Sequence, residues 1–166
     1  MSHLIPLLGI SVLVFGYFYK NYYLRIRTKY ELGSELTVEV TASEEIDEVF
    51  QLIMQDGFYS GGDINSLSPT IADNEVYSMR KNGKLVGVGF VGQSKRTASY
   101  ADVAMIIDSE NRRNGYGILI VKILVTKCRR MKLIPTAVCD VKNLASRKTL
   151  QKAGFYLDGC LLLAQV

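Results

Sequence analysis

The segment from Ile106 to Gly117 constrains the fold of this chain most. It begins as an apolar strand, passes through a short polar turn and reaches the pattern Arg-x-x-Gly-x-Gly, and a long apolar helix follows at once. A turn of this kind directs several backbone N–H groups at one point, and the helix dipole adds about half a positive charge there. Gly115 and Gly117 let the backbone approach an anion without a Cβ in between. The segment therefore predicts a pocket for a phosphate or pyrophosphate, and hence a phosphorylated cofactor.

Length, composition and charge limit the class of protein. The 166 residues suffice for one domain with a core, and 48% of them are hydrophobic, which argues against disorder. The net charge of +4 suits an anionic small molecule or a membrane surface. No basic stripe interleaved with aromatic residues is present, so nucleic acid is not expected as a partner. His3 is the only histidine and no Cys or His cluster occurs, so we expect no metal site.

An uncharged apolar run occupies residues 4–19, and a basic, tyrosine-rich segment follows it. A bilayer core needs about 20 apolar residues, with about 17 as the lower limit. Because positive flanks stay cytoplasmic, we expect a membrane anchor with the N-terminus outside and the domain on the cytoplasmic side. The alternative is a helix that docks on the domain or on a membrane protein partner, which the shortness of the run and Pro6 favour.

The chain is accordingly expected to have three parts: an apolar N-terminal helix over 1–19, a basic linker over 20–34 and one α/β domain over 35–166. Cys128, Cys139 and Cys160 are odd in number, widely spaced and set in apolar runs. This usage predicts reduced core residues, and therefore a reducing compartment for the domain.

The spacing of apolar residues predicts the order of elements within the domain. An α/β fold with a mixed, twisted sheet is expected, with antiparallel strands first and a parallel β–helix–β crossover last. Asn82-Gly83 predicts a hairpin turn, because type I′ turns need positive φ at both central residues. Strands are expected over 36–40, 76–80, 85–91, 99–107 and 135–139. Helices are expected over 42–56 after the capping box Thr41-x-x-Glu44, over 117–131, and over 143–153 between the cap Asn143 and the terminal Gly154. Residues 58–73 are expected to form a loop that can include a short helix, and a closing strand or hairpin is expected from Phe155.

Three elements in this order resemble the GNAT superfamily of acetyl-CoA-dependent N-acetyltransferases, over roughly residues 36–166. The first is the strand at Met105 that leads into the Arg-x-x-Gly-x-Gly turn. The second is the long helix with the strand over 132–138 that follows it. The third is Asn143-Leu-Ala-Ser146 followed by Lys152-Ala-Gly-Phe155. The first pattern alone is weakly specific, whereas its distance from the Asn143 segment makes the combination specific.

The resemblance implies acetyl-CoA as cosubstrate and a GNAT-like sheet that splays open beside the pantetheine arm. Backbone N–H groups of 113–118 would hold the pyrophosphate, and the strand edge at 105–107 would pair with the pantetheine amides. Asn143 would hydrogen-bond the arm while it caps its helix, and Arg112 would brace the turn or offset phosphate charge. Asn143 could equally be only a helix cap, and the two glycines only close-packing positions. The cofactor-binding set is Met105, Ile106, Ile107, Arg112, Arg113, Asn114, Gly115, Tyr116, Gly117, Ile118 and Asn143.

The catalytic groups follow less directly from the resemblance. Asp102 is the only carboxylate on the long strand, but the family's usual base position is Ala101, so Asp102 points to the other face unless a bulge re-aims it. The family's usual acid is a tyrosine where this chain has Leu150. A solvated strand carboxylate is therefore an equal interpretation of Asp102.

The leading hypothesis is a membrane-tethered N-acetyltransferase that moves an acetyl group to an amine on a small molecule, peptide or protein. Residues 57–73, with Phe58 and Tyr59, are expected to form part of the acceptor wall. The alternative is a structural subunit of a membrane protein assembly that keeps the fold with little or no turnover. A phosphate-loop nucleotide-binding protein is disfavoured, because the turn lacks the Gly-Lys-Ser/Thr of such sites.

Overall fold

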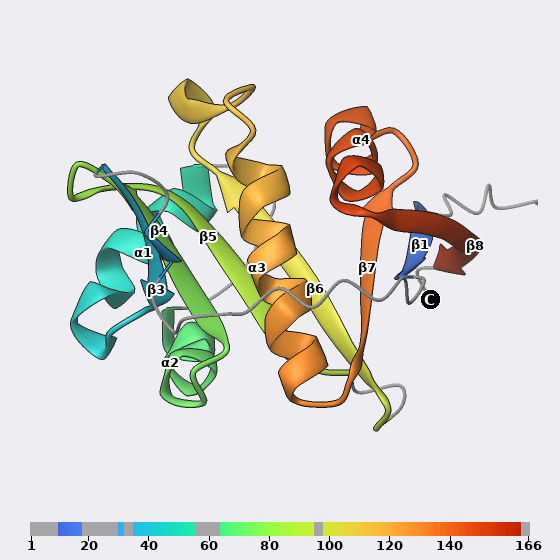
Figure 1. Ribbon diagram of the computed structural model, residues 1–166, viewed down its shortest axis with the longest axis horizontal. Coiled ribbons are helices and arrows are strands. Elements are labelled where there is room, and N and C mark those ends of the chain that lie inside the picture. Colours follow the sequence, from blue (N-terminus) through green and yellow to red (C-terminus); the bar gives the residue numbers. More distant parts are fainter. Residues whose placement is uncertain (1–9, 18–29, 32–34, 56–63, 95–97, 164–166) are drawn as a thin grey trace, which may run out of the picture.

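A computed structural model describes residues 10–17, 30–31, 35–55, 64–94 and 98–163. Within them the strands are β1 (Ile10–Tyr17), β2 (Tyr30–Glu31), β3 (Leu36–Val40), β4 (Val76–Lys81), β5 (Lys84–Gln93), β6 (Tyr100–Ile107), β7 (Ile134–Asp140) and β8 (Phe155–Leu163). The helices are α1 (Ile46–Gln55), α2 (Ile64–Ala72), α3 (Tyr116–Arg130) and α4 (Leu144–Ala153), with short 3-10 turns η1 (Ser43–Glu45) and η2 (Ser109–Asn111). The strands form one sheet in the order β2-β3-β4-β5-β6-β7-β1-β8 (Figure 1).

This mixed sheet confirms the α/β class and most of the expected elements. The β4–β5 turn at Asn82 and Gly83 has φ of 50° and 81°, as a type I′ turn requires. The crossover through α3 makes β6 and β7 a parallel pair, while β3 to β6 are antiparallel. The structure also decides between two pairs of expected alternatives: the segment predicted as a loop that can include a short helix contains the helix α2, and the end of the chain forms the closing strand Phe155–Leu163.

The sheet separates two hydrophobic cores. Met79, Val103 and Leu124 belong to the larger core, where α3 crosses β5 and β6 and contacts α4 (Figure 1). Val88 and Ile106 belong to the second core, beneath α1 and α2. Neighbouring residues of β6 thus enter different cores, as strand alternation requires. The molecule is therefore layered, with α3 and α4 on one face of the sheet and α1 and α2 on the other.

The N-terminal apolar run differs most from expectation. Ile10–Tyr17 forms strand β1 rather than part of a membrane-anchoring helix over 4–19, and β1 pairs antiparallel with both β7 and β8. An apolar stretch with β-branched residues suits a strand in the interior of a sheet. In the part of the chain that the structure describes, no helix is long and apolar enough to cross a membrane. The other residues of the expected anchor and most of the 20–34 linker lie outside the described residues.

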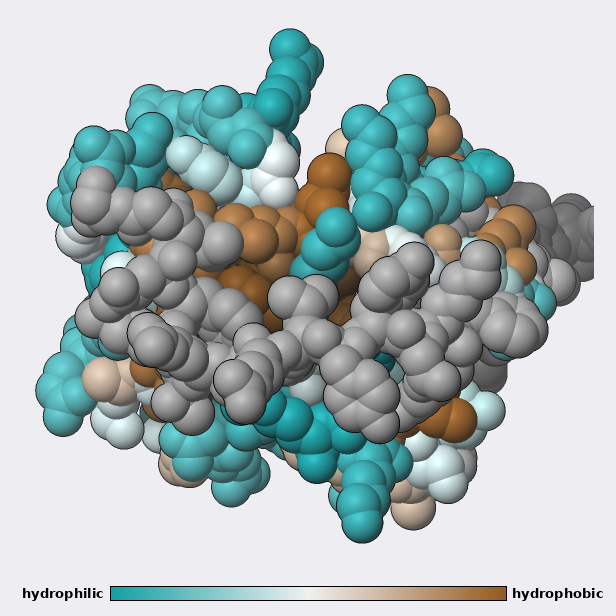
Figure 2. Space-filling model, viewed as in Figure 1, coloured by the Kyte–Doolittle hydropathy of each residue, from teal (hydrophilic) through white to brown (hydrophobic). Residues whose placement is uncertain are grey.

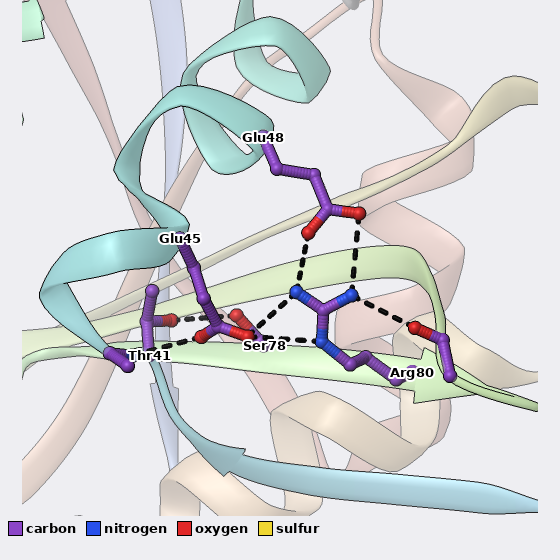
Figure 3. A network of polar contacts seen from close by, with 7 residues as sticks. Thr41, Glu45, Glu48, Ser78 and Arg80 are labelled. Atoms are coloured by element: carbon purple, nitrogen blue, oxygen red, sulfur yellow. Dashed lines mark hydrogen bonds and ion pairs between the residues drawn. The ribbon is translucent and has the colours of Figure 1, made fainter.

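A charged network fixes the start of α1 on the sheet. The guanidinium of Arg80 on β4 donates to Glu45 Oε1 from Nε (3.1 Å) and Nη2 (2.7 Å), and it also bonds Glu48 (Figure 3). The Glu45 carboxylate accepts the Ala42 N–H (2.9 Å) and so caps the helical turn one residue later than predicted. Thr41, the predicted cap, instead forms a buried 2.9 Å hydrogen bond with Ser78.

Replacing Arg80 with alanine is expected to destabilise the protein by about 1–2 kcal/mol, since two carboxylates lose charge-assisted hydrogen bonds at a part-buried site. Urea unfolding measures this loss. Arg80→Lys is the matched control, because lysine keeps the charge without the planar fork and should lose less. Equal stability of Arg80→Ala and the unchanged protein would show that the network does not hold α1.

Candidate active site

The parallel strands β6 and β7 part in the middle of the sheet. Their ladder pairs Tyr100 with Ile134 and runs only to the pair Asp102 and Thr136. Beyond this pair, β7 pairs with β1 instead, so the part of β6 after Asp102 has no strand partner on that edge. The resemblance implies a sheet that opens at this point, and the end of the β6–β7 ladder at Asp102 and Thr136 confirms it.

A cavity of about 280 Å³ lies where the strands part. It continues through the sheet, because its lining comes from helices on both faces. Asn143, Ser146 and Leu150 contribute from the α4 side. The strand residues of the lining are Phe90, Val103, Ala104, Met105, Ile106, Ala137, Val138 and Cys139, and α1 and α2 contribute Phe50, Ile53, Ser66, Leu67 and Thr70.

The turn before α3 carries backbone N–H groups that face no internal acceptor. Arg113 and Gly115 adopt positive φ of 67° and 80°. Among the described residues, no backbone hydrogen bond uses the N–H groups of residues 113–118, and Leu119 is the first to bond back, to the Gly115 oxygen at 3.1 Å. Figure 2 shows an open notch between the hydrophilic side chains of this turn and those of α4, with hydrophobic surface below it. The turn is therefore free to accept an anion.

Arg112 and the two glycines of the turn have different structural roles. Arg112 donates from Nε to the Ile107 oxygen (3.0 Å), so it braces the turn against the end of β6. A Cβ on Gly117 would lie 3.1 Å from Thr149 Cγ2, so this glycine allows α3 to approach α4. A Cβ on Gly115 would meet nothing within 4 Å, so this position is required for its φ rather than for packing.

Asn143 begins α4 at the edge of the cavity. Its Oδ1 accepts the Ser146 N–H at 3.0 Å, which is the predicted cap. Its side-chain amide NH₂ has no hydrogen-bond partner among the described residues, and the residue lines the cavity. The cap and a ligand contact therefore use different atoms of the same side chain.

Asp102 lies at the last rung of the β6–β7 ladder. Its Oδ1 accepts a hydrogen bond from Thr136 Oγ1 at 2.8 Å. The β5–β6 register has no shift, so no bulge re-aims the strand, and the neighbouring Ala101 is fully buried in the α3-side core. Asp102 therefore faces the side of α1 and α2, next to the cavity lining rather than in it. Leu150, where the family has its acid, lines the cavity as an apolar side chain.

Glu75 is a carboxylate on the same face that the sequence analysis missed. It precedes β4, and its oxygens lie within 2.7–3.0 Å of the position of a Cβ on Gly92, the residue opposite Asp102. Burial, followed by repulsion from Asp73, raises the pKa of Glu75. No local motif identifies it, because its surroundings come from separate strands.

Glu75→Gln should be more stable relative to the unchanged protein at about pH 7 than at about pH 4. The raised pKa means that the folded state holds the Glu75 proton more tightly, so stability falls as pH rises from the ordinary glutamate pKa through the folded one. Glutamine removes this loss. Thermal unfolding at both pH values measures it, with Glu39→Gln on the exposed part of β3 as control. A stability difference between Glu75→Gln and the unchanged protein that does not vary with pH would contradict a raised pKa for Glu75.

The two described cysteine side chains are buried free thiols, as predicted. Burial raises the pKa of Cys128 to about 12. Burial, with a smaller effect of Asp140, also raises the pKa of Cys139, which lines the cavity. Because the thiolate is the nucleophile, neither residue is an activated one. Within the described part of the chain, no group of His, Cys, Asp and Glu could hold a metal ion.

Solved structures with this fold include several acetyltransferases. A GNAT-family acetyltransferase from Colwellia psychrerythraea gives a TM-score of 0.74 at 18% identity, covering 92% of this chain and 54% of that chain. YncA, a putative acetyltransferase from Salmonella typhimurium solved with acetyl-CoA, gives 0.68 at 13% identity, covering 76% and 82%. The Salmonella typhimurium enzyme that modifies the N-terminal serine of ribosomal protein L7/L12 gives 0.64 at 16%, covering 79% and 86%.

This chain thus spans about half the length of the Colwellia protein, and these identities establish the fold only. No curated protein matches the sequence. The sequence profile of the acetyltransferase (GNAT) family, in contrast, matches residues 45–155, from η1 to the start of β8. That range includes the open N–H groups, the parted strands and all of the described residues that line the cavity. The chain belongs to the acetyltransferase (GNAT) family.

Proposed function

We propose that this protein transfers an acetyl group from acetyl-CoA to an amine. The observation that carries the proposal is the continuity between three features: free N–H groups at 113–118, an unpaired edge of β6, and a cavity that passes through the sheet. The pyrophosphate of the cofactor would lie at the N–H groups, its pantetheine arm along the edge of β6 and its thioester in the cavity, so that one molecule would occupy all three. Acetyl-CoA in the YncA structure supports this cofactor for the fold.

The residues present fit that cofactor in chemistry as well as in position. The N–H groups of residues 113–118 would bind the diphosphate, with Arg112 holding the turn. The backbone groups of Met105 and Ile107 face the open edge of β6, whereas Ile106 belongs to a hydrogen-bonded pair with β5. The N–H and C=O of Met105 and the N–H of Ile107 would pair with the pantetheine amides, and Asn143 would donate from its free NH₂. Each of these groups is held by regular structure, so the site needs little ordering when the cofactor binds.

The reaction requires a neutral amine to attack the thioester carbonyl. A C–N bond forms, the C–S bond breaks, the amine loses a proton and the CoA thiolate gains one. Asp102 is the candidate acceptor of the amine proton through water, and Glu75 is a second carboxylate on the same face. Leu150 supplies no acid, so the thiolate would take its proton from water. Positioning of the two reactants would then provide much of the rate.

Calorimetric titration with acetyl-CoA, followed by amine-dependent release of the CoA thiol, tests the proposal. Saturable binding and thiol release with an amine are expected. Absence of binding would reject the cofactor and the enzyme together. Binding without release by any amine in a broad panel would reject turnover and leave a binding protein with an acetyltransferase fold.

Asn143→Asp is expected to raise the KM for acetyl-CoA by about tenfold, because one hydrogen bond is worth about 1 kcal/mol and the new charge adds repulsion to the cofactor. Aspartate still caps α4, so thermal stability should change little. Steady-state kinetics measure the effect, and Asn143→Ser, which caps without an amide, is the control. An unchanged KM in both variants would assign Asn143 to the cap alone.

The proposal places the domain in a reducing, CoA-containing compartment. The free thiols of Cys128 and Cys139 support this, since both side chains are buried and unpaired. The acceptor is proposed as an amine on a small molecule, a peptide or a protein. The Salmonella enzyme that modifies the N-terminal serine of L7/L12 shows that one protein of this fold acts on a protein amine.

A further inference from the structure

The part of the cavity beneath α1 and α2 is apolar, and its composition bears on the acceptor. Phe50 and Ile53 lie one turn apart on α1, Leu67 comes from α2 and Phe90 from β5. Ile53 and Leu67 are buried, while the two aromatic side chains are half-buried and pack against the α1–α2 core. Phe50 and Phe90 therefore offer ring surface to a molecule in the cavity.

The polar groups of this lining are uncharged. On the α1–α2 side they are the hydroxyls of Ser66 and Thr70. No charged side chain occurs among the described residues that line the cavity. On α1, Glu48 bonds Arg80. Among the described residues of the lining, a second positive charge on an acceptor would therefore meet no carboxylate.

Resting on the proposed acetyl transfer, we infer that the acceptor is a primary amine whose substituent is aromatic or alkyl, rather than a polyamine or a hydroxylated amine. The apolar group would lie against Phe50, Ile53, Leu67 and Phe90, with the amino group toward the opening between β6 and β7.

The same lining accounts for deprotonation of the acceptor. An ammonium group loses hydration in apolar surroundings, which lowers its pKa and favours the neutral, nucleophilic amine. The proton leaves to water as the amine enters. The apolar site thereby favours the deprotonated amine, which a dedicated base would otherwise produce. Transfer can then proceed although Asp102 lies beside the cavity and position 150 is a leucine.

The test is calorimetric binding of four amines to the full chain saturated with CoA: phenethylamine and hexylamine against ethanolamine and putrescine. The apolar amines are expected to bind at least about tenfold more tightly, because each buried methylene strengthens binding about fourfold. Equal or tighter binding of putrescine or ethanolamine would overturn the inference, as would binding of none. Failure of CoA itself to bind would instead reject the proposed function.

Phe50→Glu provides a second test within the same cavity. The half-buried position tolerates a charged side chain better than the buried Ile53 would. The new carboxylate should tighten putrescine and weaken phenethylamine, each by about tenfold, whereas the control Phe50→Leu should keep the order of the unchanged protein. If the Phe50→Glu variant binds CoA but keeps the order of amine affinities of the unchanged protein, the placement of the substituent against Phe50 is overturned. Thermal unfolding checks folding, and the four-amine comparison stands if this variant does not fold.

Discussion

Deletion of residues 1–17 is expected to leave a chain whose C-terminal half does not fold. β1 lies between β7 and β8 and makes antiparallel ladders with both, and these two strands do not pair with each other. Without β1, β7 keeps only the three residue pairs that it forms with β6, and β8 loses its strand partner. Stability of a domain this size is about 5–15 kcal/mol, so loss of two ladders should exceed what the rest can sustain.

Circular dichroism and size-exclusion chromatography of the deleted chain measure this effect. The substitution Val12→Pro should disrupt the same strand at a single position. Proline removes a backbone N–H in the interior of the sheet, where Val12 lies opposite both Asp140 and Leu161. Val12→Thr keeps the N–H and the β-branched shape, and should remain folded. A deleted chain that stays monomeric, with a cooperative melt and unchanged acetyl-CoA binding, would show that β1 is dispensable.

Gly115→Asp is expected to lower acetyl-CoA affinity by about 100-fold. The carboxylate would extend into the open space beside the free N–H groups, where the diphosphate is placed. Like charges about 4 Å apart repel by about 4 kcal/mol at an effective dielectric constant near 20, and solvent screening reduces this at an exposed turn. Calorimetry at low and high salt measures the loss, which should shrink as salt rises.

Gly115→Asn is the matched control for this substitution. Asparagine has the shape of aspartate, and both residues tolerate the positive φ of 80° at this position better than other side chains do. Its affinity loss should be about tenfold smaller than that of the aspartate variant. Equal losses in the two variants would mean that bulk or strain, rather than charge beside a diphosphate, explains the effect.

The sequence predicted elements that are defined by local residues. Asn82-Gly83 requires one turn type, Asn143 and Gly154 mark the ends of α4, and the pattern from Arg112 to Gly117 marks the turn before α3. In each case a few neighbouring side chains determine the backbone. These signals were sufficient for the fold class and for the conformation of these turns and helix ends.

The features that the sequence did not predict depend on contacts between residues that are distant in sequence. An unbroken apolar run has no period that separates helix from strand, and the strands that flank β1 lie more than 100 residues away. Pro69 lies inside α2, and because proline is disfavoured in a helix interior, the sequence predicted only a loop that can include a short helix there. Phe50, Leu67 and Phe90 have ordinary core spacing in the sequence, and only the tertiary arrangement places them around one cavity.

Amide NMR of the full chain during titration with CoA measures the central claim most directly. If the N–H groups of residues 113–118 bind the diphosphate, their resonances should shift with CoA and with ADP, and should stay in place with pantetheine, which lacks that group. Saturable CoA binding that leaves these amides unchanged would contradict the account, because the cofactor would then lie elsewhere.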